Sequence, residues 1–475
     1  MRKLNFEYVQ LTFISDKQEI RKQIRNTLIL IHLFEKYNNP VRLEKLIEGT
    51  QYGYNASALQ SGKNKFLRIS DIHESKVDWS TVPFCNCNDE ETYLLNNEDI
   101  LIARTGGTTG KSFKIENPPK HSIYAGYLIR IRAKKEVNPD YIYLFLHSFA
   151  YWSQIVNLNE RNFRPKANAE NLKSLILPDC KRSIQDEAVR ISQGENIKGY
   201  EDLFSEIEKV LSEYDNTQQV ENLLSAQLTQ LENLNQAILQ EAVQGKLVEQ
   251  NKKNEPASEL LKRIKAEKAK SGKKEKPLPP IKPEEIPFEI PDSWVWCRLG
   301  EMSINRDGER KPIAQSDRNI RKKIYDYYGA SGVIDKIDGY THEGELLLIG
   351  EDGANLVARS TPIAFLAKGK FWVNNHAHVV DTVDRITLDY LCSYINSIDL
   401  KPYVTGGFQP KLSQGNLNII PVPLPPLSEQ KRIVSEIEKQ LAKTKQLKEH
   451  IIANQHATEQ LLKALLHQAF AVEDI

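Results

Sequence analysis

The chain has 475 residues, of which 40% are hydrophobic and 27% charged, and its 64 Lys and Arg nearly balance its 63 Asp and Glu. This length suffices for more than one hydrophobic core, and the formal charge of +1 excludes a surface coated uniformly in positive charge. Five scattered cysteines without a CxxC pair predict neither a disulfide framework nor a zinc knuckle, and the longest apolar run, residues 28–34, is too short for a bilayer. We therefore expect a soluble, multi-domain, cytoplasmic protein.

The first half of the chain predicts a helix, a mixed domain and a helical arm in that order. Residues 16–37 carry apolar side chains every three to four positions, which predicts an amphipathic helix within an N-terminal extension, residues 1–40, that we expect to be an extra arm. Residues 41–180 show short apolar stretches between Gly, Asn and Pro clusters, which is typical of an α+β domain. Residues 181–250 return to a helical pattern with an interrupted apolar seam and predict a coiled-coil arm.

The second half begins with a basic, proline-rich segment, residues 251–290, which predicts a flexible linker. Residues 291–426 predict a second mixed domain, and residues 427–475 a second coiled-coil arm with Thr444, Asn454 and Thr458 in its seam. Any amphipathic helix gives such a stripe, but the similar C-terminal ends of the two arms favour a mutual pair. Polar seam residues would weaken the packing and fix its register.

The chain also repeats itself at long spacing. Phe163-Arg164-Pro165-Lys166 recurs 245 positions later as Phe408-Gln409-Pro410-Lys411, and the string Ser-Glu-Ile-Glu-Lys-x-Leu occurs at residues 205–211 and again at 435–441. A weaker echo relates residues 97–107 to residues 343–353, about 246 positions apart. A period this long indicates a duplicated domain together with its connecting helix. We therefore predict an α+β protein of two similar domains and two similar helical arms.

Three motifs suggest catalytic or metal chemistry but are incomplete. Residues 103–112 resemble a phosphate-binding loop, yet Thr105 stands where the motif requires glycine, and the following residues predict strand and turn. Residues 117–119, Asn-Pro-Pro, resemble an amino-methyltransferase motif but lack the aromatic fourth residue. His376 and His378 alternate along a strand with no carboxylate or cysteine cluster to complete a metal shell, so we predict no metal site. Residues 103–112 instead favour a glycine-rich loop that approaches DNA, with a plain turn as the alternative.

Five stretches of the second half are similar to the specificity subunit of type I restriction-modification enzymes. They are residues 290–300 (IPDSWVWCRLG), 327–335 (YYGASGVID), 349–356 (IGEDGANL), 371–379 (FWVNNHAHV) and 423–438 (PLPPLSEQKRIVSEIE). The resemblance covers nearly the whole chain after about residue 40. The first half departs from it, because residues 38–46 lack the Pro-x-x-Trp signature and no PPLSEQ follows Cys180, so we expect the first arm to begin later.

This resemblance implies two target-recognition domains, each reading one half of a bipartite site in double-stranded DNA. It also implies two long antiparallel coiled-coil helices that join and space these domains and dock two methyltransferase (modification) subunits. The chain itself would be non-catalytic and free of cofactors, with S-adenosylmethionine in the methyltransferase and ATP and Mg in a separate restriction (motor) subunit. The assembled complex would be a site-specific adenine methyltransferase and an ATP-dependent endonuclease. A specificity module of a related methylase-nuclease system and a coiled-coil adaptor that does not bind DNA remain alternatives.

The candidate DNA-binding residues come from basic segments, from the glycine-rich loop and from the repeated Phe-x-Pro-Lys frames. Solvated surface charge and structural hydrogen bonding are the alternative roles for these side chains. In the first half the candidates are Lys63, Lys65, Arg68, Arg104, Thr108, Thr109, Lys111, Arg164 and Lys166. In the second half they are Arg310, Lys311, Lys322, Lys323, Asp352, Asn355, Arg359, Asn374, Asn375, His376, Gln409 and Lys411.

Overall fold

The computed structural model describes residues 17–73, 76–105, 108–157, 167–251, 253–270, 277–407 and 409–470. The chain forms two compact units, the first made of Met1–Leu223 with Asn454–Ile475 and the second of Leu224–Ala453. Both boundaries fall inside long helices, α7 (Glu201–Val243) and α14 (Leu427–Ala469), so each helix contributes to both units. Among the described residues, no helix is both long and apolar enough to span a membrane.

Unit 1 combines small sheets with helices, as predicted for an α+β domain. Its central sheet has the order β2-β10-β7-β8 with antiparallel neighbours, a second sheet has the order β6-β3-β9, and two-stranded pairs join β1 to β11 and β4 to β5. The strands are β1 (Pro40–Arg42), β2 (Ile47–Tyr52), β3 (Asn64–Leu67), β4 (Ile72–His73), β5 (Lys76–Val77), β6 (Phe84–Cys85), β7 (Ile100–Ala103), β8 (Ser112–Lys114), β9 (Ser122–Tyr124), β10 (Leu128–Ala133) and β11 (Ile176–Pro178).

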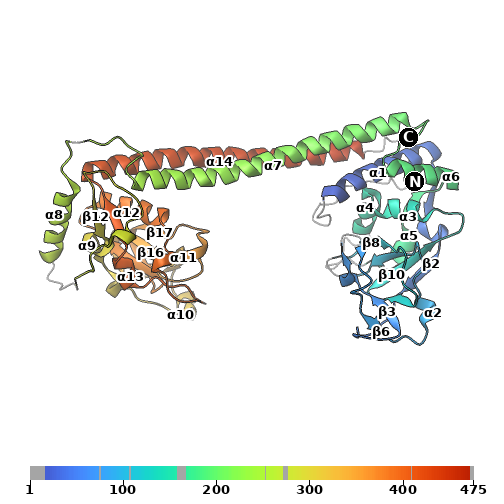
Figure 1. The fold of residues 1–475 in the computed structure, drawn as a ribbon, viewed down its shortest axis with the longest axis horizontal. Coiled ribbons are helices and arrows are strands. Elements are labelled where there is room, and N and C mark those ends of the chain that lie inside the picture. Colours follow the sequence, from blue (N-terminus) through green and yellow to red (C-terminus); the bar gives the residue numbers. More distant parts are fainter. Residues whose placement is uncertain are drawn as a thin grey trace. The chain divides into compact units, whose positions relative to one another are not determined.

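In Figure 1 helices α1, α3, α4 and α6 lie on one side of the central strands of unit 1, whereas the short α2 lies at the opposite end, near β3 and β6. Asn138 and Pro139 start α3, because the Asn138 side chain accepts a hydrogen bond from the amide of Asp140 and proline suits the first helical position. The helices before α7 are α1 (Lys17–Tyr37), α2 (Glu90–Tyr93), α3 (Pro139–Leu146), α4 (Phe149–Asn157), α5 (Ala169–Ser174) and α6 (Arg182–Ser192), and the 3-10 turns are η2 (Leu43–Lys45) and η3 (Ile69–Asp71).

The helix predicted at the N-terminus exists as α1, but the expectation of an extra arm is wrong. Ile24 and Leu28 are buried in the main core of unit 1, and the polar residues Asn26 and Thr27, which lie off this apolar stripe, are buried as well. The Asn26 amide donates to the carbonyl oxygens of Leu144 and His147, which satisfies part of its polar surface inside the core. A single apolar stripe in the sequence could not reveal a helix that is surrounded on more than one side.

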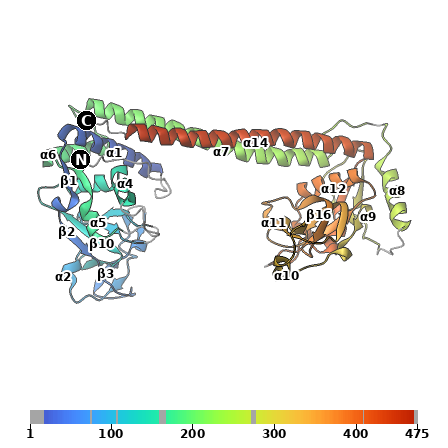
Figure 2. The same ribbon diagram turned by 180° about the vertical axis from the view of Figure 1, so that it is seen from behind.

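Unit 2 is built around a six-stranded sheet of order β13-β18-β16-β17-β14-β15, in which only the β14–β17 pair is parallel among the described strands. Helix α12 (Arg385–Ser397) packs on β16 and β17 (Figure 2), where Leu388 and Leu391 meet Leu347 and Ile349. The strands are β12 (Val295–Arg298), β13 (Ile304–Asn305), β14 (Tyr325–Gly329), β15 (Gly332–Ile337), β16 (His342–Gly350), β17 (Ala364–Val373), β18 (Ala377–Asp381) and β19 (Pro421–Leu424). The other helices and turns are α8 (Ala257–Lys270), η4 (Pro283–Glu285), α9 (Leu299–Met302), η5 (Asp307–Glu309), α10 (Gln315–Asn319), α11 (Asn355–Ala358), η6 (Lys401–Tyr403) and α13 (Gln414–Asn418).

The two units repeat the same hydrogen bonds at the same place in their folds. The hydroxyl of Tyr141 donates to the carbonyl of Pro178, and that of Tyr390 donates to the carbonyl of Pro423. The repeated Asn-Leu of the sequence lies in α5 and α13, which begin at the capping residues Asn168 and Ser413, 245 positions apart. The predicted duplication is therefore present in the structure as well as in the sequence.

The first arm begins later after its strand than the second, as expected. After β11 the chain forms α6, turns, and starts α7 at Glu201, whereas α14 begins three residues after β19. Gln185 in α6 nevertheless takes the place of Gln430 in the PPLSEQ stretch. Each glutamine donates to a carbonyl five residues before it, Cys180 or Pro425. The first half thus keeps the glutamine-to-carbonyl hydrogen bond of this motif without its amino-acid sequence.

The expectation of a flexible linker at residues 251–290 is wrong for residues 257–270, which form α8. Ala257, Leu260, Leu261 and Ile264 are buried in the main core of unit 2, at the spacing of one helix face. The high charge of the segment hid this stripe. Farther along, the buried Arg298 guanidinium donates to the carbonyls of Pro279 and Pro280 and pairs with Glu285, which fixes the proline-rich stretch as well.

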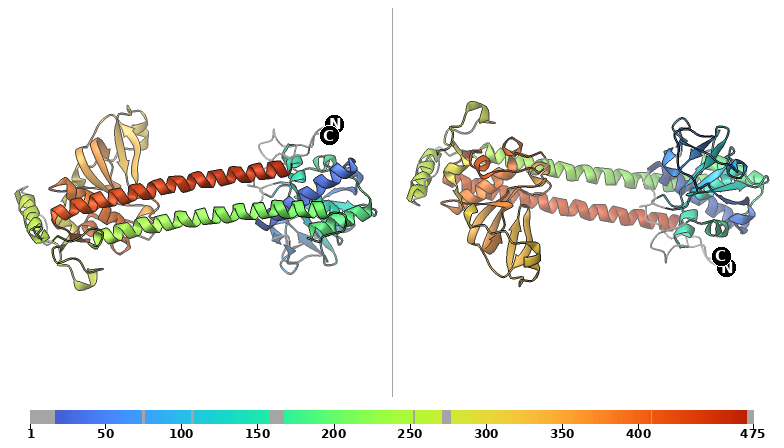
Figure 3. Two further views of the ribbon diagram at one scale, coloured as in Figure 1. Left: turned by 90° about the horizontal axis from the view of Figure 1, so that it is seen from above. Right: turned by 90° about the horizontal axis from the view of Figure 1, so that it is seen from below.

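Within unit 2, the C-terminal part of α7 lies beside the N-terminal part of α14 (Figure 3). Thr444 donates to the side chain of Asn235 at 2.6 Å, and Lys448 approaches Glu232 at 3.8 Å, so the two helices are antiparallel, as predicted. Thr444 occupies the seam as predicted, whereas Asn454 is exposed.

The C-terminal part of α14 packs into the core of unit 1 through Leu462 and Leu466, which are 2% and 0% exposed. The adjacent Leu461 is 64% exposed and so lies outside this contact.

Candidate nucleic-acid interface

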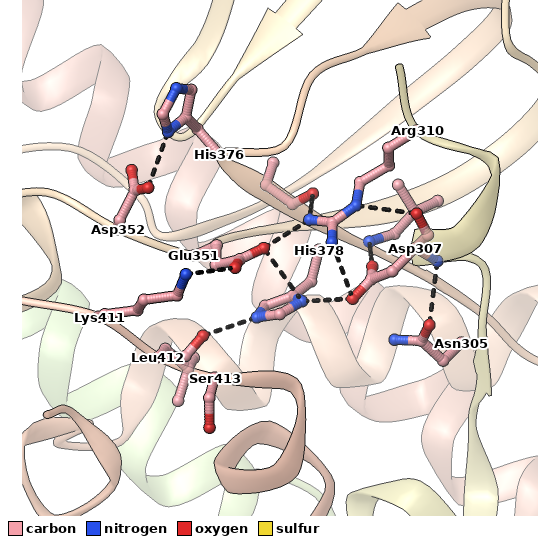
Figure 4. Close-up of polar contacts among 12 residues, drawn as sticks. Asn305, Asp307, Arg310, Glu351, Asp352, His376, His378, Lys411, Leu412 and Ser413 are labelled. Carbon is pink, nitrogen blue, oxygen red and sulfur yellow. Dashed lines mark hydrogen bonds and ion pairs between the residues drawn. The ribbon is translucent and has the colours of Figure 1, made fainter. Parts of the chain in front are cut away.

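Three loops of unit 2 meet at the edge where strand β16 ends and β18 begins. The Glu351 amide donates to the carbonyl of His376, the Leu412 amide to the carbonyl of Glu351, and the Gly353 amide to the carbonyl of Pro410. These bonds join residues 351–353, 374–376 and 409–412 into what we term the strand-end surface of unit 2 (Figure 4). The repeated Phe-x-Pro-Lys frame is thereby attached directly to the end of the central strand.

A buried charge network lies directly beneath this surface. His378 is 1% exposed, its Nδ1 lies 2.6 Å from an oxygen of Asp307, and its Nε2 lies 2.7 Å from the carbonyl oxygen of Leu412. Burial raises the pKa of the Asp307 carboxyl, whereas the hydrogen bond and charge of His378 lower it. The lowering contacts together outweigh burial, so the net pKa is below the usual value. Both ring nitrogens of His378 therefore lie within hydrogen-bond distance of a protein acceptor.

Arg310 and Lys411 complete the network (Figure 4). The Arg310 guanidinium lies 2.5 Å from Glu351 and 3.4 Å from Asp307, and it donates to the carbonyl of Ala377 at 2.8 Å. The Lys411 ammonium lies 3.2 Å from the other oxygen of Glu351. Asp307 therefore has two ion-pair partners, His378 and Arg310, and Glu351 has three, because the His378 Nδ1 also lies 3.7 Å from it. Such pairing is the arrangement that makes buried charge tolerable.

The side chains of Asp307, Glu351 and His378 lie close enough together to hold a metal ion, with ligand atoms within 4.8 Å of one another. The stated reason for predicting no metal site was wrong, because two carboxylates do meet His378, from distant segments. Their chemistry nonetheless disfavours a metal. Both ring nitrogens of His378 already have hydrogen-bond partners, and the Arg310 guanidinium lies within ion-pair distance of both carboxylates.

Several predicted residues come together on the strand-end surface. The His376 Nδ1 lies 2.7 Å from Asp352, so its Nε2 faces away from that carboxylate, and the side chain is 48% exposed. Asn374 is buried and accepts a hydrogen bond from the His376 amide. The remaining predicted residues at this edge are Lys311, whose amide donates to the carbonyl of Val373, and the exposed residues Asn375, Gln409 and Lys411.

The other predicted residues of unit 2 lie away from the strand-end surface or already have structural partners. Arg359 donates to the carbonyls of Ile395 and Ile398 at the end of α12, and Asn355 closes a turn by binding Thr361. Lys323 pairs with Asp335 at 2.8 Å, and Lys322 is exposed beside it.

In unit 1, Arg104 follows β7 as Glu351 follows β16. The Arg104 amide donates to the carbonyl of Tyr127, and the Ala167 amide donates to the carbonyl of Arg104. The Arg104 guanidinium is exposed and lies 4.9 Å from the ring centre of Tyr52, a cation–π contact. Arg164 and Lys166, which precede Ala167 in the chain, lie outside the described residues.

The rest of the glycine-rich loop leads into a strand, β8, as predicted, rather than into the helix of a phosphate-binding loop. Thr108 and Lys111 are partly exposed and Thr109 is buried. Lys63, Lys65 and Arg68 lie elsewhere in unit 1 and pair with Glu90, the carbonyl of Val82, and Asp71, respectively.

Sequence reasoning missed Tyr127, Asp307 and Glu351, and it dismissed His378. A signal for Glu351 was available, because the glycine-rich stretch and its echo mark the ends of equivalent strands. In the structure this equivalence has a spacing of 247, since Ile100 and Ile102 face the helix-side core as Leu347 and Ile349 do. A spacing of 246 would place them on the opposite face of the sheet.

Comparisons with known proteins relate part of the chain to one family. The family described as "Type I restriction modification DNA specificity domain" matches residues 291–454. The Escherichia coli EcoEI specificity subunit is 31% identical over 267 residues, which are 50% of this chain and 44% of that protein. The Escherichia coli EcoAI specificity subunit is 34% identical over 272 residues, 51% of this chain and 44% of that protein. The matched part of the chain thus spans less than half the length of either relative.

A solved structure reported for the complex assembly and conformational transition of the type I R-M system resembles this chain throughout. The alignment covers 92% of this chain and 98% of that one, with a TM-score of 0.52 and 16% sequence identity. At this identity the likeness establishes the fold alone.

Proposed function

From the premise that the chain belongs to the family of type I restriction enzyme specificity subunits, we propose that each of its two units reads one half of a bipartite site in double-stranded DNA. The observation that carries this proposal is the pair of equivalent strand ends. Both units attach the segment after Phe-x-Pro-Lys to the end of the central strand by the same backbone bond, Ala167 to Arg104 and Leu412 to Glu351. The side chains displayed there differ, as two different half-sites require.

The proposal includes partners for the helical arms. Helices α7 and α14 would space the two reading units and dock two methyltransferase subunits, which bind S-adenosylmethionine, while a motor subunit uses ATP and Mg to translocate and cleave DNA in the cytoplasm. This chain would then contribute recognition only. A coiled-coil adaptor that does not bind DNA accounts for the arms but not for two duplicated reading units.

Exchange of one unit is expected to change one half-site. Residues 299–420 of unit 2 can be replaced by the equivalent segment of another such subunit, because the cuts fall just inside the β12–β19 pair, at Arg298 and Pro421. The complex with its methyltransferase should then recognise a new sequence in one half of the site and keep the other half and the spacing. Sequencing of methylated adenines across a host genome measures this.

The matched control exchanges residues 43–175 of unit 1, just inside the β1–β11 pair. It should change the other half-site. If either exchange altered both halves together, independent reading by the two units would be wrong. If the wild-type complex bound and methylated DNA without sequence preference, the adaptor reading would replace the proposal.

The purified chain alone is expected to show no methyl transfer, ATP hydrolysis or DNA cleavage. The reason is chemical, because Thr105 interrupts the phosphate-binding pattern and Lys120 stands where the methyltransferase motif needs an aromatic ring. Radiolabelled S-adenosylmethionine and ATP assays on the chain, with and without the partner subunits, test this. Turnover by the chain alone that disappears on a point substitution in it would contradict the expectation.

A further inference from the structure

We propose that Tyr127 in unit 1 and His376 in unit 2 occupy one equivalent position and that each determines which base its unit accepts at one position of its half-site. The inference rests on the proposed function and goes beyond it by assigning specificity to two named side chains. The two residues differ in type, their neighbours in the sequence differ, and neither lies in one of the repeated motifs.

The equivalence follows from two backbone hydrogen bonds in each unit and from one strand pairing. In each unit the first residue after the central strand donates its amide to a backbone carbonyl: Arg104 donates to the carbonyl of Tyr127, and Glu351 donates to the carbonyl of His376. The same residue accepts from the segment after Phe-x-Pro-Lys. Tyr127 directly precedes β10 and His376 directly precedes β18, and each of these strands pairs antiparallel with the strand that ends at this site, β10 with β7 and β18 with β16. The backbone frame is therefore the same although the side chains are unrelated.

Both side chains are presented to solvent at this frame. Tyr127 is 68% exposed, the largest exposure of any aromatic residue among the exposed hydrophobic side chains of the described chain, and His376 is 48% exposed. An exposed tyrosine in a soluble domain is common, but here it recurs as an exposed aromatic ring at the matched position of a second, diverged unit. Conserved placement with altered chemistry is what a specificity position requires.

The two rings offer different hydrogen-bonding groups to a base edge. The Tyr127 hydroxyl can donate and accept, whereas Asp352 holds the Nδ1 of His376 and leaves Nε2 to meet the ligand. Because each base pair shows its own pattern of donors and acceptors in the major groove, exchanging these groups changes the preferred base. Cations at the same edges, Arg104 in unit 1 and Lys311 and Lys411 in unit 2, suit the phosphates that position a protein without specifying sequence.

Two substitutions exchange the proposed determinants, Tyr127→His and His376→Tyr. Each variant, assembled with its methyltransferase partner, is scored by sequencing methylated adenines across a genome and by competition binding to oligonucleotides that differ at single positions. We expect the preference at one position of one half-site to change by about tenfold to a hundredfold, with the other half-site and the spacing unchanged. Tyr127→Phe removes only the hydroxyl and should relax the same position as Tyr127→His.

Tyr340→His is the matched control. Tyr340 is an exposed aromatic residue of unit 2 that precedes β16 and so lies at the opposite end of that strand from Glu351. It should leave both half-sites unchanged. The proposal is overturned if the exchange variants keep the wild-type preference at every position, and equally if they lose affinity uniformly for all sequences, which would assign phosphate contacts. Absence of a bipartite preference in the wild-type complex would instead remove the proposed function itself.

A variant that fails to fold is recognised by its amide hydrogen exchange, and the second substitution at each position then decides the question. For unit 2 this is His376→Asn, which keeps a side chain able to bind Asp352 and alters the outward group. An unchanged base preference with His376→Asn and with Tyr127→Phe would overturn the proposal for the respective unit.

Discussion

Replacing His378 with alanine is expected to destabilise unit 2 by about 3 kcal/mol, the lower end of the cost of removing one partner from a buried ion pair. The substitution leaves Asp307 buried with its remaining partners, the amide of Val379 and the Arg310 guanidinium at 3.4 Å, and it frees the Leu412 carbonyl. The lower end of the range applies because Arg310 still neutralises part of the charge. The same change removes the side chain that ties the strand-end surface to the sheet.

His376→Ala is the control, two residues away. His376 pairs with Asp352 as His378 pairs with Asp307, but it is about half exposed, so its loss should cost less than about 1 kcal/mol. Amide hydrogen exchange of the full chain reports each unit separately. Protection of β16 and β18 should fall more than a hundredfold in the His378 variant, since about 1.4 kcal/mol corresponds to a factor of ten, while β7 and β10 of unit 1 stay unchanged. Equal losses in both variants would show that the buried network contributes no special stability.

The dependence of the unfolding free energy on pH below neutrality provides a second test of the same network. The pKa of Asp307 lies below its usual value, so its stabilising contribution is fully present above about pH 4, the ordinary range for a carboxyl, and is lost as the pH falls through the lower folded-state value. Without His378 this contribution is smaller at every pH. The difference in unfolding free energy between wild type and His378→Ala should therefore shrink as the pH falls below about 4.

The duplication, both long helices and the strands around the glycine-rich loop were predictable because local patterns carry them. The apolar seam, the repeated Phe-x-Pro-Lys frame and the Asn-Leu after it are each visible within a short window, and the structure shows buried Leu172 and Leu417 at the repeated leucines. The role of α1 and of α8 was not predictable in this way. Their burial depends on what surrounds them in three dimensions, and in α8 lysines conceal the apolar face from a composition argument.

The charge network was hidden for a different reason. Asp307, Glu351, His378 and the Leu412 carbonyl come from four segments spread over more than a hundred residues, and each looks unremarkable beside its own neighbours. The equivalence of Tyr127 with His376 depended on a one-residue shift in register, from the echo at about 246 to the spacing of 247 in the sheets. Matching the two segments by residue type gives the spacing of about 246, whereas matching their strands by the sheet face that each side chain occupies gives 247.

Lengthening both arms together is expected to move the two half-sites apart without changing their sequences. The contacts of Asn235 with Thr444 and of Glu232 with Lys448 show that a step back along α7 matches a step forward along α14. By this register, a four-residue insertion between Ala453 and Asn454 faces one between Ala226 and Gln227. Made in both helices, the insertions add about 6 Å, close to two base pairs of rise, and keep the apolar stripe within about 40° of its phase.

An insertion in α14 alone is the matched control. This insertion shifts the apolar seam of α14 relative to that of α7. Thr444 keeps its contact with Asn235 on one side of the insertion, but the leucines of α14 beyond the insertion lose their partners. We therefore expect loss of activity rather than a new spacing. Mapping of methylated adenines in cells that carry each variant distinguishes the outcomes. A paired insertion that leaves the gap unchanged at full activity would show that the arms do not set the spacing, because reading units that find DNA through flexible tethers have no preferred separation to lengthen.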